Sequence, residues 1–337
     1  MQTKIPHSLS CIEEDDIVNV KEVMKSGYLK NGHWVKQLQM KVANDINMSF
    51  SVITFTGSLA IFLALKLLEL PRSAKVILPA YICKSVTTAI RMSGAIPLFC
   101  DVSFEDCSLD LKSVNKKLDH SVTTIIIAHL FGNIANVEKF TNFSVPIIED
   151  AAQAPGGQNL GKYSDMLIFS FEGTKMLCAG EGGILAFKSD KLAKLLKERL
   201  SRGDICSLTT TDIQASVALS QWNKREIFIK KRRLLAQNYD HAFFPHGIRR
   251  FGNQDSLFSR YVIKDCLNVD EMIIKASKEN IQLRKPIDPE AIATPNWKEF
   301  PVTKHLVSSN LSVPIYPSLT EKAQNQIINF VLKHIKI

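Results

Sequence analysis

The 337-residue sequence lacks the features that define several other classes of protein. Its cysteines, at positions 11, 83, 100, 107, 178, 206 and 266, form no CxxC pair, and the chain is too long to need a disulfide framework. We therefore expect free thiols in a reducing cytoplasm. The N-terminal stretch MQTKIPHSLSCIEEDD has no apolar core of signal-peptide length. Neither an internal repeat nor a low-complexity linker interrupts the chain.

Long apolar runs are also missing. The nearest approach is 46–65, which has no charged residue and is close to the ~20 residues that span a bilayer. Polar residues occur throughout this stretch and Gly57-Ser58 interrupts it, so a strand, a turn and a buried helix explain it better than a membrane span. No GxGxxG follows the first expected strand, which disfavours a dinucleotide-binding protein.

The balance of charge is mildly basic. Lys and Arg number 42 against 33 Asp and Glu, a net charge of +9, and 45% of the residues are hydrophobic. This composition is that of a globular protein and fits an anionic substrate or cofactor. The most basic run, KREIFIKKRR (224–233), falls in an expected helix and carries no known nucleic-acid motif. We interpret it as a solvated helix face and expect no nucleic-acid partner.

Strands and helices alternate along the first two thirds of the chain. Continuous β-branched runs are typical of parallel strands buried on both faces, so we expect an α/β fold with a mostly parallel central sheet between helices. The expected strands are 52–55, 75–81, 96–102, 123–131, 145–150, 165–171 and 184–187. The expected helices are 58–69, one ending at 92, 110–118, 134–141, 190–202 and 212–243. Two short helices within 11–45 flank the loop GYLKNGHW (27–34), which either reaches a pocket or is a surface connection.

The pattern changes near Pro245. A smaller α+β part is expected there, with strands at 259–265 and 281–284, a helix at 269–280 and a closing amphipathic helix at 321–335. We therefore divide the chain into a large domain, 1–244, and a small C-terminal domain, 245–337. The large domain contains the stretch from Val145 to Lys188, which carries the candidate site.

In that stretch, chemistry stands at the ends of buried strands. VPIIED ends in the carboxylate Asp150, DMLIFSF is followed by a short polar turn and Lys175, and GEGG (180–183) opens a third strand. Ligands of open α/β sheets bind outside the carboxyl ends of strands. A ligand between Asp150 and Lys175 would meet an anion on one side and an amine on the other. This suits the cofactor pyridoxal phosphate (PLP), because the lysine forms a Schiff base and the carboxylate keeps the pyridine nitrogen protonated. We therefore predict that 1–244 is a PLP-binding domain.

Two neighbouring features fit the phosphate of such a cofactor. Ser170 precedes Lys175 by five residues, so one loop can place a hydroxyl on the phosphate and an amine near the aldehyde carbon. Thr56-Gly57-Ser58 stands where a strand passes into a helix, whose N–H groups and dipole favour an anion, although a plain N-cap has the same pattern. Asp150, Gln153, Ser170 and Lys175 together, with GEGG behind them, indicate a site that no one of them would.

The motifs IEDAAQA, FSFxxxK and GEGG, in that order, resemble the sugar aminotransferases of the DegT–DnrJ–StrS family, PLP enzymes of fold type I. GYLKNG resembles the loop that leads into the family's site, TGSLAIFLAL its phosphate turn and helix, and LPAYICKSV its strand end over the cofactor. PLFCDV, AHLFGN, TDIQASVALSQ and VPIYPSLTE extend the resemblance over nearly the whole chain.

The resemblance implies roles for particular residues. Lys175 would hold the cofactor and move protons at the substrate carbon, while Asp150 would pair with the pyridine nitrogen. Gln153 would lie near the phenolic oxygen, and Ser170 would bind the phosphate together with the backbone of Gly57-Ser58. The resemblance also implies a homodimer with the site near the subunit interface. The reaction would convert a keto group of a nucleotide-linked sugar to an amine, with L-glutamate as donor, in surface polysaccharide or antibiotic biosynthesis.

Three positions depart from the family pattern. Cys83 stands where an aromatic residue usually stacks on the cofactor ring, and Tyr81, the nearest aromatic, is expected to point to the other side of the strand. Ser207 replaces an Asn that usually reaches the partner subunit's phosphate, and Pro155 follows AQA where many members have His. The departures at Cys83 and Ser207 keep open a PLP-binding regulator or a degenerate, non-catalytic member. A sugar dehydratase is disfavoured, because that branch replaces the lysine with histidine and Lys175 is present.

Overall fold

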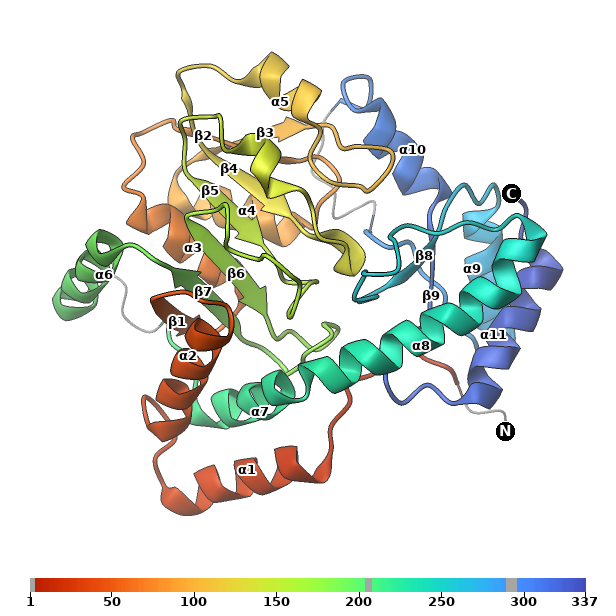
Figure 1. Ribbon diagram of the computed structural model, residues 1–337, viewed down its shortest axis with the longest axis horizontal. Coiled ribbons are helices and arrows are strands. Elements are labelled where there is room, and N and C mark those ends of the chain that lie inside the picture. Colours follow the sequence, from red (N-terminus) through yellow and green to blue (C-terminus); the bar gives the residue numbers. More distant parts are fainter. Residues whose placement is uncertain (1–3, 204–207, 289–295) are drawn as a thin grey trace.

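The computed structural model describes residues 4–203, 208–288 and 296–337. A seven-stranded sheet lies at its centre, in the order β1-β7-β6-β5-β4-β2-β3 (Figure 1). The strands are β1 (Phe50–Thr54), β2 (Lys75–Pro79), β3 (Ile96–Cys100), β4 (Val122–Ala128), β5 (Ile147–Asp150), β6 (Met166–Ser170) and β7 (Gly183–Phe187). β7 runs antiparallel to both of its neighbours and the remaining pairs are parallel. The expected mostly parallel sheet is confirmed.

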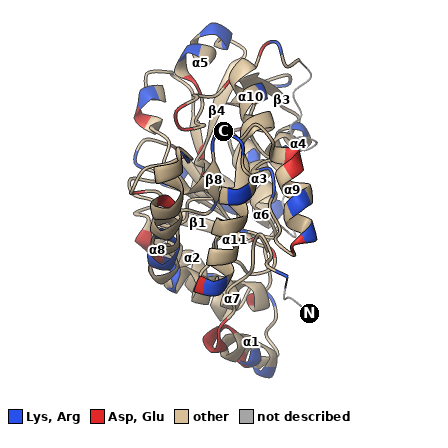
Figure 2. Cartoon of the chain, turned by 90° about the vertical axis from the view of Figure 1, so that its right-hand side faces the viewer, with Lys and Arg blue, Asp and Glu red and all other residues tan. Residues whose placement is uncertain are grey.

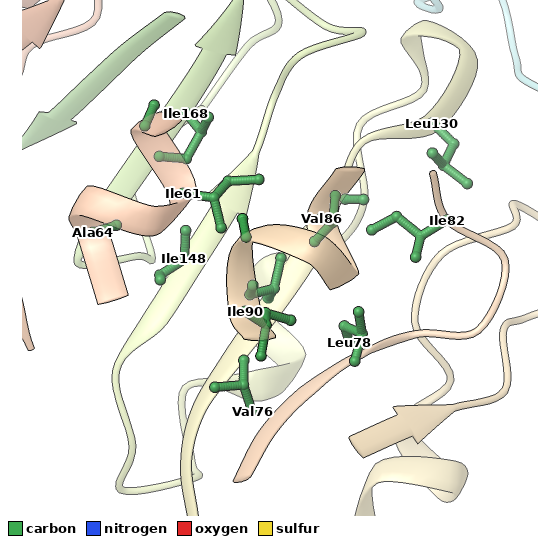
Figure 3. Close-up of a cluster of buried hydrophobic side chains, with 14 of the residues drawn as sticks. Ile61, Ala64, Val76, Leu78, Ile82, Val86, Ile90, Leu130, Ile148 and Ile168 are labelled. Carbon is green, nitrogen blue, oxygen red and sulfur yellow. The ribbon is translucent and has the colours of Figure 1, made fainter. Parts of the chain in front are cut away.

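One face of the sheet is covered by α3 (Gly57–Leu67) and α4 (Lys84–Ser93). Figure 3 shows apolar side chains of both helices meeting alternate residues of the strands. The strand residues on this face include Val76, Leu78, Ile148 and Ile168. Because successive strand residues point to opposite faces, their neighbours Ile77, Ile147 and Leu167 belong to the cores on the other side. Full burial of each such side chain stabilises the fold by roughly 1.5–3 kcal/mol.

The other face has two groups of helices. At the β1–β7–β6 end, α2 (His33–Asp45) and α7 (Asp212–Asn223) bury a core around Trp222. At the opposite end, α5 (Leu111–Lys117) and the 3-10 turn η2 (Val137–Phe140) cover β2 and β4. α1 (Glu14–Ser26) packs outside α7, and α6 (Asp190–Arg202) follows β7. The sheet is therefore the middle of three layers.

A second core lies beyond the sheet. It contains the antiparallel strands β8 (Tyr261–Ile263) and β9 (Leu311–Val313) with α9 (Val269–Lys278) and α11 (Glu321–His334). The long helix α8 (Arg225–Phe243) runs from α7 to this part, and its C-terminal half packs in the second core (Figure 1). The remaining elements are α10 (Pro301–Ser309), η1 (Leu130–Gly132) and η3 (Phe244–His246). The domain division at 244 and 245 stays a prediction.

Several local expectations are wrong. The helix expected at 134–141 is only the 3-10 turn η2, and the strand expected at 281–284 reduces to isolated bridges at Ile281 and Arg284. The long helix 212–243 is interrupted at Lys224, which ends α7 and precedes α8. The helix α10 and the strand β9 lie where the sequence pattern predicts no element. These differences involve short segments, whose conformation depends on the elements packed against them.

The basic run 224–233 is a solvated face only in part, because Lys230 and Lys231 are exposed whereas its other cations have partners within the fold. The Lys224 amine donates to two carboxylates of α1, at 2.7 and 2.8 Å, and the Arg225 guanidinium lies 2.9 Å from Asp45. Arg232 is buried and donates to three backbone carbonyls. Figure 2 shows that lysines and arginines are spread over many helices with acidic residues among them. The cations at 224, 225 and 232 therefore hold elements together.

Within the described parts of the chain, no helix is both long enough and apolar enough to cross a lipid bilayer.

Candidate active site

A cavity of about 360 Å³ opens where β4, β5 and β6 end and α3 and α4 begin. It brings together all but one of the site residues predicted from the sequence: Thr56, Gly57, Ser58, Cys83, Asp150, Gln153, Ser170 and Lys175. Ser207 lies outside the described residues. Side chains separated by more than 100 positions thus converge on one space, as expected for the carboxyl edge of a mostly parallel sheet.

Asp150 is the last residue of β5, between β4 and β6. Its Oδ1 accepts a hydrogen bond from the Ala152 N–H at 3.0 Å. Burial raises the pKa of the Asp150 carboxyl above 3.8, although that hydrogen bond and the charge of Lys175 act in the opposite direction. A half-buried carboxylate of this kind is stabilised by a cationic or N–H donor placed in the cavity.

Lys175 follows a tight turn at the end of β6. Its backbone N–H donates to the Glu172 carbonyl at 2.8 Å. The Glu172 carboxylate in turn accepts from the N–H and hydroxyl of Thr174, at 3.1 and 2.6 Å. These bonds fix the path of the turn, and the Lys175 side chain lines the cavity that Asp150 also lines.

The start of α3 forms an anion cradle. The Thr56 hydroxyl caps the helix by accepting from the Leu59 N–H at 3.1 Å. Gly57 is required sterically, since a Cβ there would lie 2.9 Å from the Ser170 Cβ and 3.1 Å from its hydroxyl oxygen. A Cβ at Gly183, the first residue of β7, would collide with the Thr56 carbonyl. The first N–H groups of the helix and the Ser170 hydroxyl therefore share one small space.

Gln153 is held in a single orientation. Its side-chain oxygen accepts from the Phe131 N–H at 2.9 Å. Phe131 has φ of +62°, a left-handed conformation that is costly for a residue other than glycine. Because the oxygen is occupied, the side-chain NH2 is the group of Gln153 that can donate to a ligand in the cavity.

The structure adds residues that the sequence did not single out. His129 lines the cavity, and its Nε2 donates to Glu149 Oε2 at 2.8 Å, both side chains being buried. His129 Nδ1 accepts from the Ala135 N–H at 3.0 Å, so the ring proton lies on Nε2. The backbone N–H of His129 donates to the backbone carbonyl of Asp150 at 3.0 Å. The consecutive carboxylates of IIED and the histidine directly after an apolar run were the available signals.

Cys83 and Tyr81, which follow β2, point to different sides, as expected. Cys83 lines the cavity, whereas Tyr81 is fully buried on the other side of the chain. The Tyr81 hydroxyl accepts from the Asn310 side chain at 3.4 Å. The aromatic ring therefore does not replace the missing stacking partner, and a thiol occupies that wall.

The loop 27–34 does not line the cavity of its own chain. Its backbone is tied to the start of α7, because the Asp212 carboxylate accepts from the N–H groups of Gly32, Trp34 and Val35 at 2.7, 2.9 and 3.3 Å. Tyr28 and Leu29, in the same loop, are 77% and 42% exposed. Within one chain the loop is a surface connection.

The chemistry of these groups fits PLP. An anion cradle at a helix start, a half-buried carboxylate and a lysine amine suit the phosphate, the pyridine nitrogen and the aldehyde of that cofactor. Together with the three-layer fold, the set defines a fold type I PLP-dependent transferase.

The chain belongs to the DegT/DnrJ/EryC1/StrS aminotransferase family, whose sequence profile matches residues 10–332. It is 27% identical to a dTDP-3-amino-3,4,6-trideoxy-alpha-D-glucose transaminase of Micromonospora megalomicea, over 95% of this chain and 94% of that one. It is 24% identical to the spore coat polysaccharide biosynthesis protein SpsC of Bacillus subtilis, over 98% and 97%.

Solved structures show the same fold. A putative sugar aminotransferase, Spr1654 from Streptococcus pneumoniae in its PMP form, superposes with a TM-score of 0.88 at 20% identity, over 97% of this chain and 96% of that one. The same protein has also been solved in a PLP form. The predicted family, fold class and PLP dependence are confirmed.

Proposed function

We propose that this protein transfers an amino group from L-glutamate to the keto group of a nucleotide-linked sugar, in the biosynthesis of an amino sugar for a surface polysaccharide or an antibiotic. The observation that carries the proposal is the meeting of Lys175, Asp150 and the α3 cradle in one cavity. Family membership and the sugar aminotransferases among the relatives support it.

The cradle and the carboxylate would position the cofactor. Gly57, Ser58 and Ser170, which line the cavity together with Asp150, would bind its phosphate, and Asp150 would bind its ring nitrogen. When bound, the cofactor supplies a ring that accepts electrons from the substrate carbon. Asp150 would strengthen this by remaining ionised beside the protonated nitrogen, because the new charge offsets its burial. The NH2 group of Gln153 would donate to the phenolic oxygen.

Lys175 would carry the proton transfers. With the cofactor bound, the Lys175 amine would hold it through its aldehyde group. The same amine would be the group that takes a proton from the substrate carbon or returns one to it. The buried pair of His129 and Glu149 keeps the strand ends around Asp150 in position, since His129 bonds both the Glu149 side chain and the Asp150 backbone.

A homodimer is part of the proposal. α1, α2 and the loop 27–34 carry exposed apolar side chains that a partner subunit would cover: Ile17, Val18, Met24, Tyr28, Leu29 and Met40. Single exposed apolar residues are ordinary, but a group on adjacent elements is typical of an interface. Sedimentation of the wild type and of Tyr28→Asp tests this: a shift of the variant toward monomer supports it, and a monomeric wild type contradicts it.

We also assign the protein to the cytoplasm, which the six described free cysteines support.

The activity is tested with the purified protein loaded with PLP. Borohydride reduction should attach the cofactor covalently to Lys175, as mass spectrometry of the digested chain would show. L-glutamate should then convert the bound cofactor to its amine form, and a panel of nucleotide keto-sugars should convert it back. A protein that binds PLP but responds to no amino donor would instead support a regulatory role.

A further inference from the structure

The 3-10 turn η1 connects the two main cores of the fold beside Gln153. Phe131, at the centre of this turn, is buried in the core between the sheet and the helices α3 and α4. The carbonyl of Gly132 accepts a hydrogen bond from the Leu257 N–H at 2.9 Å. Leu257 belongs to the segment that leads into β8, a strand of the second core. The turn therefore bonds the sheet side of the molecule to the second core.

The backbone of this turn is strained and closely packed. Phe131 and Gly132 have φ of +62° and +89°, both in the left-handed region. Glycine adopts such a φ readily, whereas the conformation is costly for phenylalanine. A Cβ at Gly132 would lie 2.8 Å from the Phe258 nitrogen and 2.9 Å from the Ser259 nitrogen. These are backbone atoms that cannot rotate away, so the second core approaches the turn as closely as a bare glycine allows.

The same turn holds the side chain of Gln153. The backbone N–H of Phe131 donates to the Gln153 side-chain oxygen at 2.9 Å, and both residues are buried. An amide group is planar, so a fixed oxygen also fixes the direction of its NH2 group. In the proposed function this NH2 group donates to the phenolic oxygen of the cofactor. A displacement of η1 would therefore turn the amide or break its bond to Phe131.

We propose that Gly132 is a positioning residue of the reaction, because it lets the second core pack against η1 and thereby fixes the orientation of Gln153. This inference rests on the proposed function, since it names what holds Gln153 in its role there. Gln153 lines the cavity, whereas Phe131 and Gly132 are not among the described residues that line it. Strained backbone persists where the surrounding structure over-determines it, and such strain is concentrated at functional sites. The turn therefore acts on the site through Gln153.

The test is a double-mutant cycle between Gly132→Ala and Gln153→Leu, which lacks the amide. Gly94→Ala is the matched control, because Gly94 has a nearly identical φ of +91° but a Cβ there would meet no atom within 4 Å. Fluorescence titration of each apoprotein with PLP gives the affinity, and the absorbance spectrum reports the environment of the bound cofactor. Circular dichroism shows whether each variant is folded.

Gly132→Ala and Gln153→Leu should each weaken PLP binding by roughly tenfold or more and change the spectrum in the same way, since each removes a hydrogen bond from a charged oxygen. The double variant should stay within about twofold of Gln153→Leu, whereas independent effects would multiply. Gly94→Ala should lose stability through the same backbone strain but keep its PLP affinity within about twofold of the wild type. Independent effects, or an unchanged affinity in Gly132→Ala, overturn the inference and leave the proposed function intact.

Phe251→Leu provides a second route if Gly132→Ala does not fold. The Phe251 N–H donates to the Val262 carbonyl of β8, and its ring lies 6.4 Å from that of Phe131. Leucine loosens this contact without placing an atom in the turn. PLP affinity should fall in the wild-type background and stay unchanged in the Gln153→Leu background. No effect in the first, or equal effects in both, overturns the inference. A wild type that binds no PLP overturns the proposed function and this inference together.

Discussion

Gly57 and Ser170 approach so closely that a single added methyl group at Gly57 would lie 2.9 Å from the Ser170 Cβ. Real Cβ atoms do not come this near to other heavy atoms, so one of the two residues would have to move. Both belong to the proposed phosphate cradle, one at the start of α3 and the other at the end of β6. The packing of the fold and the binding of the cofactor therefore depend on the same contact.

Gly57→Ala is accordingly expected to weaken PLP binding by roughly tenfold or more, because displacing Ser170 or the first turn of α3 removes a hydrogen bond to a charged phosphate. Fluorescence titration of the apoprotein with PLP gives the affinity. Ser58→Ala serves as a comparison, since it removes a hydroxyl without crowding Ser170. An affinity for Gly57→Ala equal to that of the wild type would show that the cradle tolerates a side chain and does not grip the phosphate there.

Lys175→Ala should abolish turnover and borohydride trapping, because no other amine in the described cavity can replace it. The loss should exceed roughly a thousandfold in the rate of the half-reaction. Lys191→Ala, at an exposed lysine of α6, is the matched control and should react like the wild type. Trapping of the cofactor on another lysine in the variant would contradict the assignment.

Asp150→Asn should affect the apoprotein and the loaded protein in opposite directions. Burial raises the pKa of Asp150, so the folded apoprotein keeps a proton that the unfolded chain releases, and its stability falls as pH rises above 3.8 through the raised pKa. Above that window the ionised carboxylate destabilises the apoprotein, and asparagine removes this cost. Calorimetry at pH 7 should show a melting temperature higher by roughly 2 °C without PLP. With PLP present the variant should bind the cofactor at least about tenfold more weakly; a lower melting temperature for the apo variant would refute the argument.

His7 should make stability depend on pH near neutrality. Its pKa is lowered, so below pH 6.5 the unfolded chain takes up a proton that the folded protein resists. The free energy of unfolding is therefore expected to fall as pH decreases from 6.5, by at most about 1.4 kcal/mol per pH unit. Urea unfolding between pH 7.5 and 5.5 measures this slope. His7→Asn should flatten it, and His246→Asn, at an exposed histidine, should leave it unchanged. An equal slope in all three proteins would exclude His7 as its source.

Much of the large part of the fold could be predicted, because long buried runs such as those of β4 and β5 have one compatible arrangement when helices alternate with them. The candidate site could be predicted as well, because Asp150 and Lys175 lie at or just after the ends of predicted strands. Arg260, which also lines the cavity, could not be predicted from the sequence in this way. Nothing in SRYVIKD distinguishes a cavity arginine from a surface one, and its position depends on how the second core packs on the first.

The partners of the buried cations in the run 224–233 could not be predicted for a related reason. A run such as KREIFIKKRR gives no sign of its partners, and those of Lys224 stand more than 200 residues earlier, in α1. Charge patterns are read locally, whereas burial is decided by tertiary contacts. The sequence of the loop 27–34 likewise fits either a pocket or a surface connection, and the contacts that decide between them come from Asp212, about 180 residues away along the chain.

The reversed strand β7 has a consequence for how this protein is made. The edge strand β1 leaves the ribosome early, yet its hydrogen-bonded partner, 183–187, is translated about 130 residues later. In a nascent chain that stops before Gly183, β1 has no strand to pair with. The turn at Thr56 and Gly57, which follows β1, then lacks the backbone of Gly183 that packs against it. The cofactor pocket can therefore form only after more than half of the polypeptide has been synthesised. A prematurely terminated product should be unable to bind PLP.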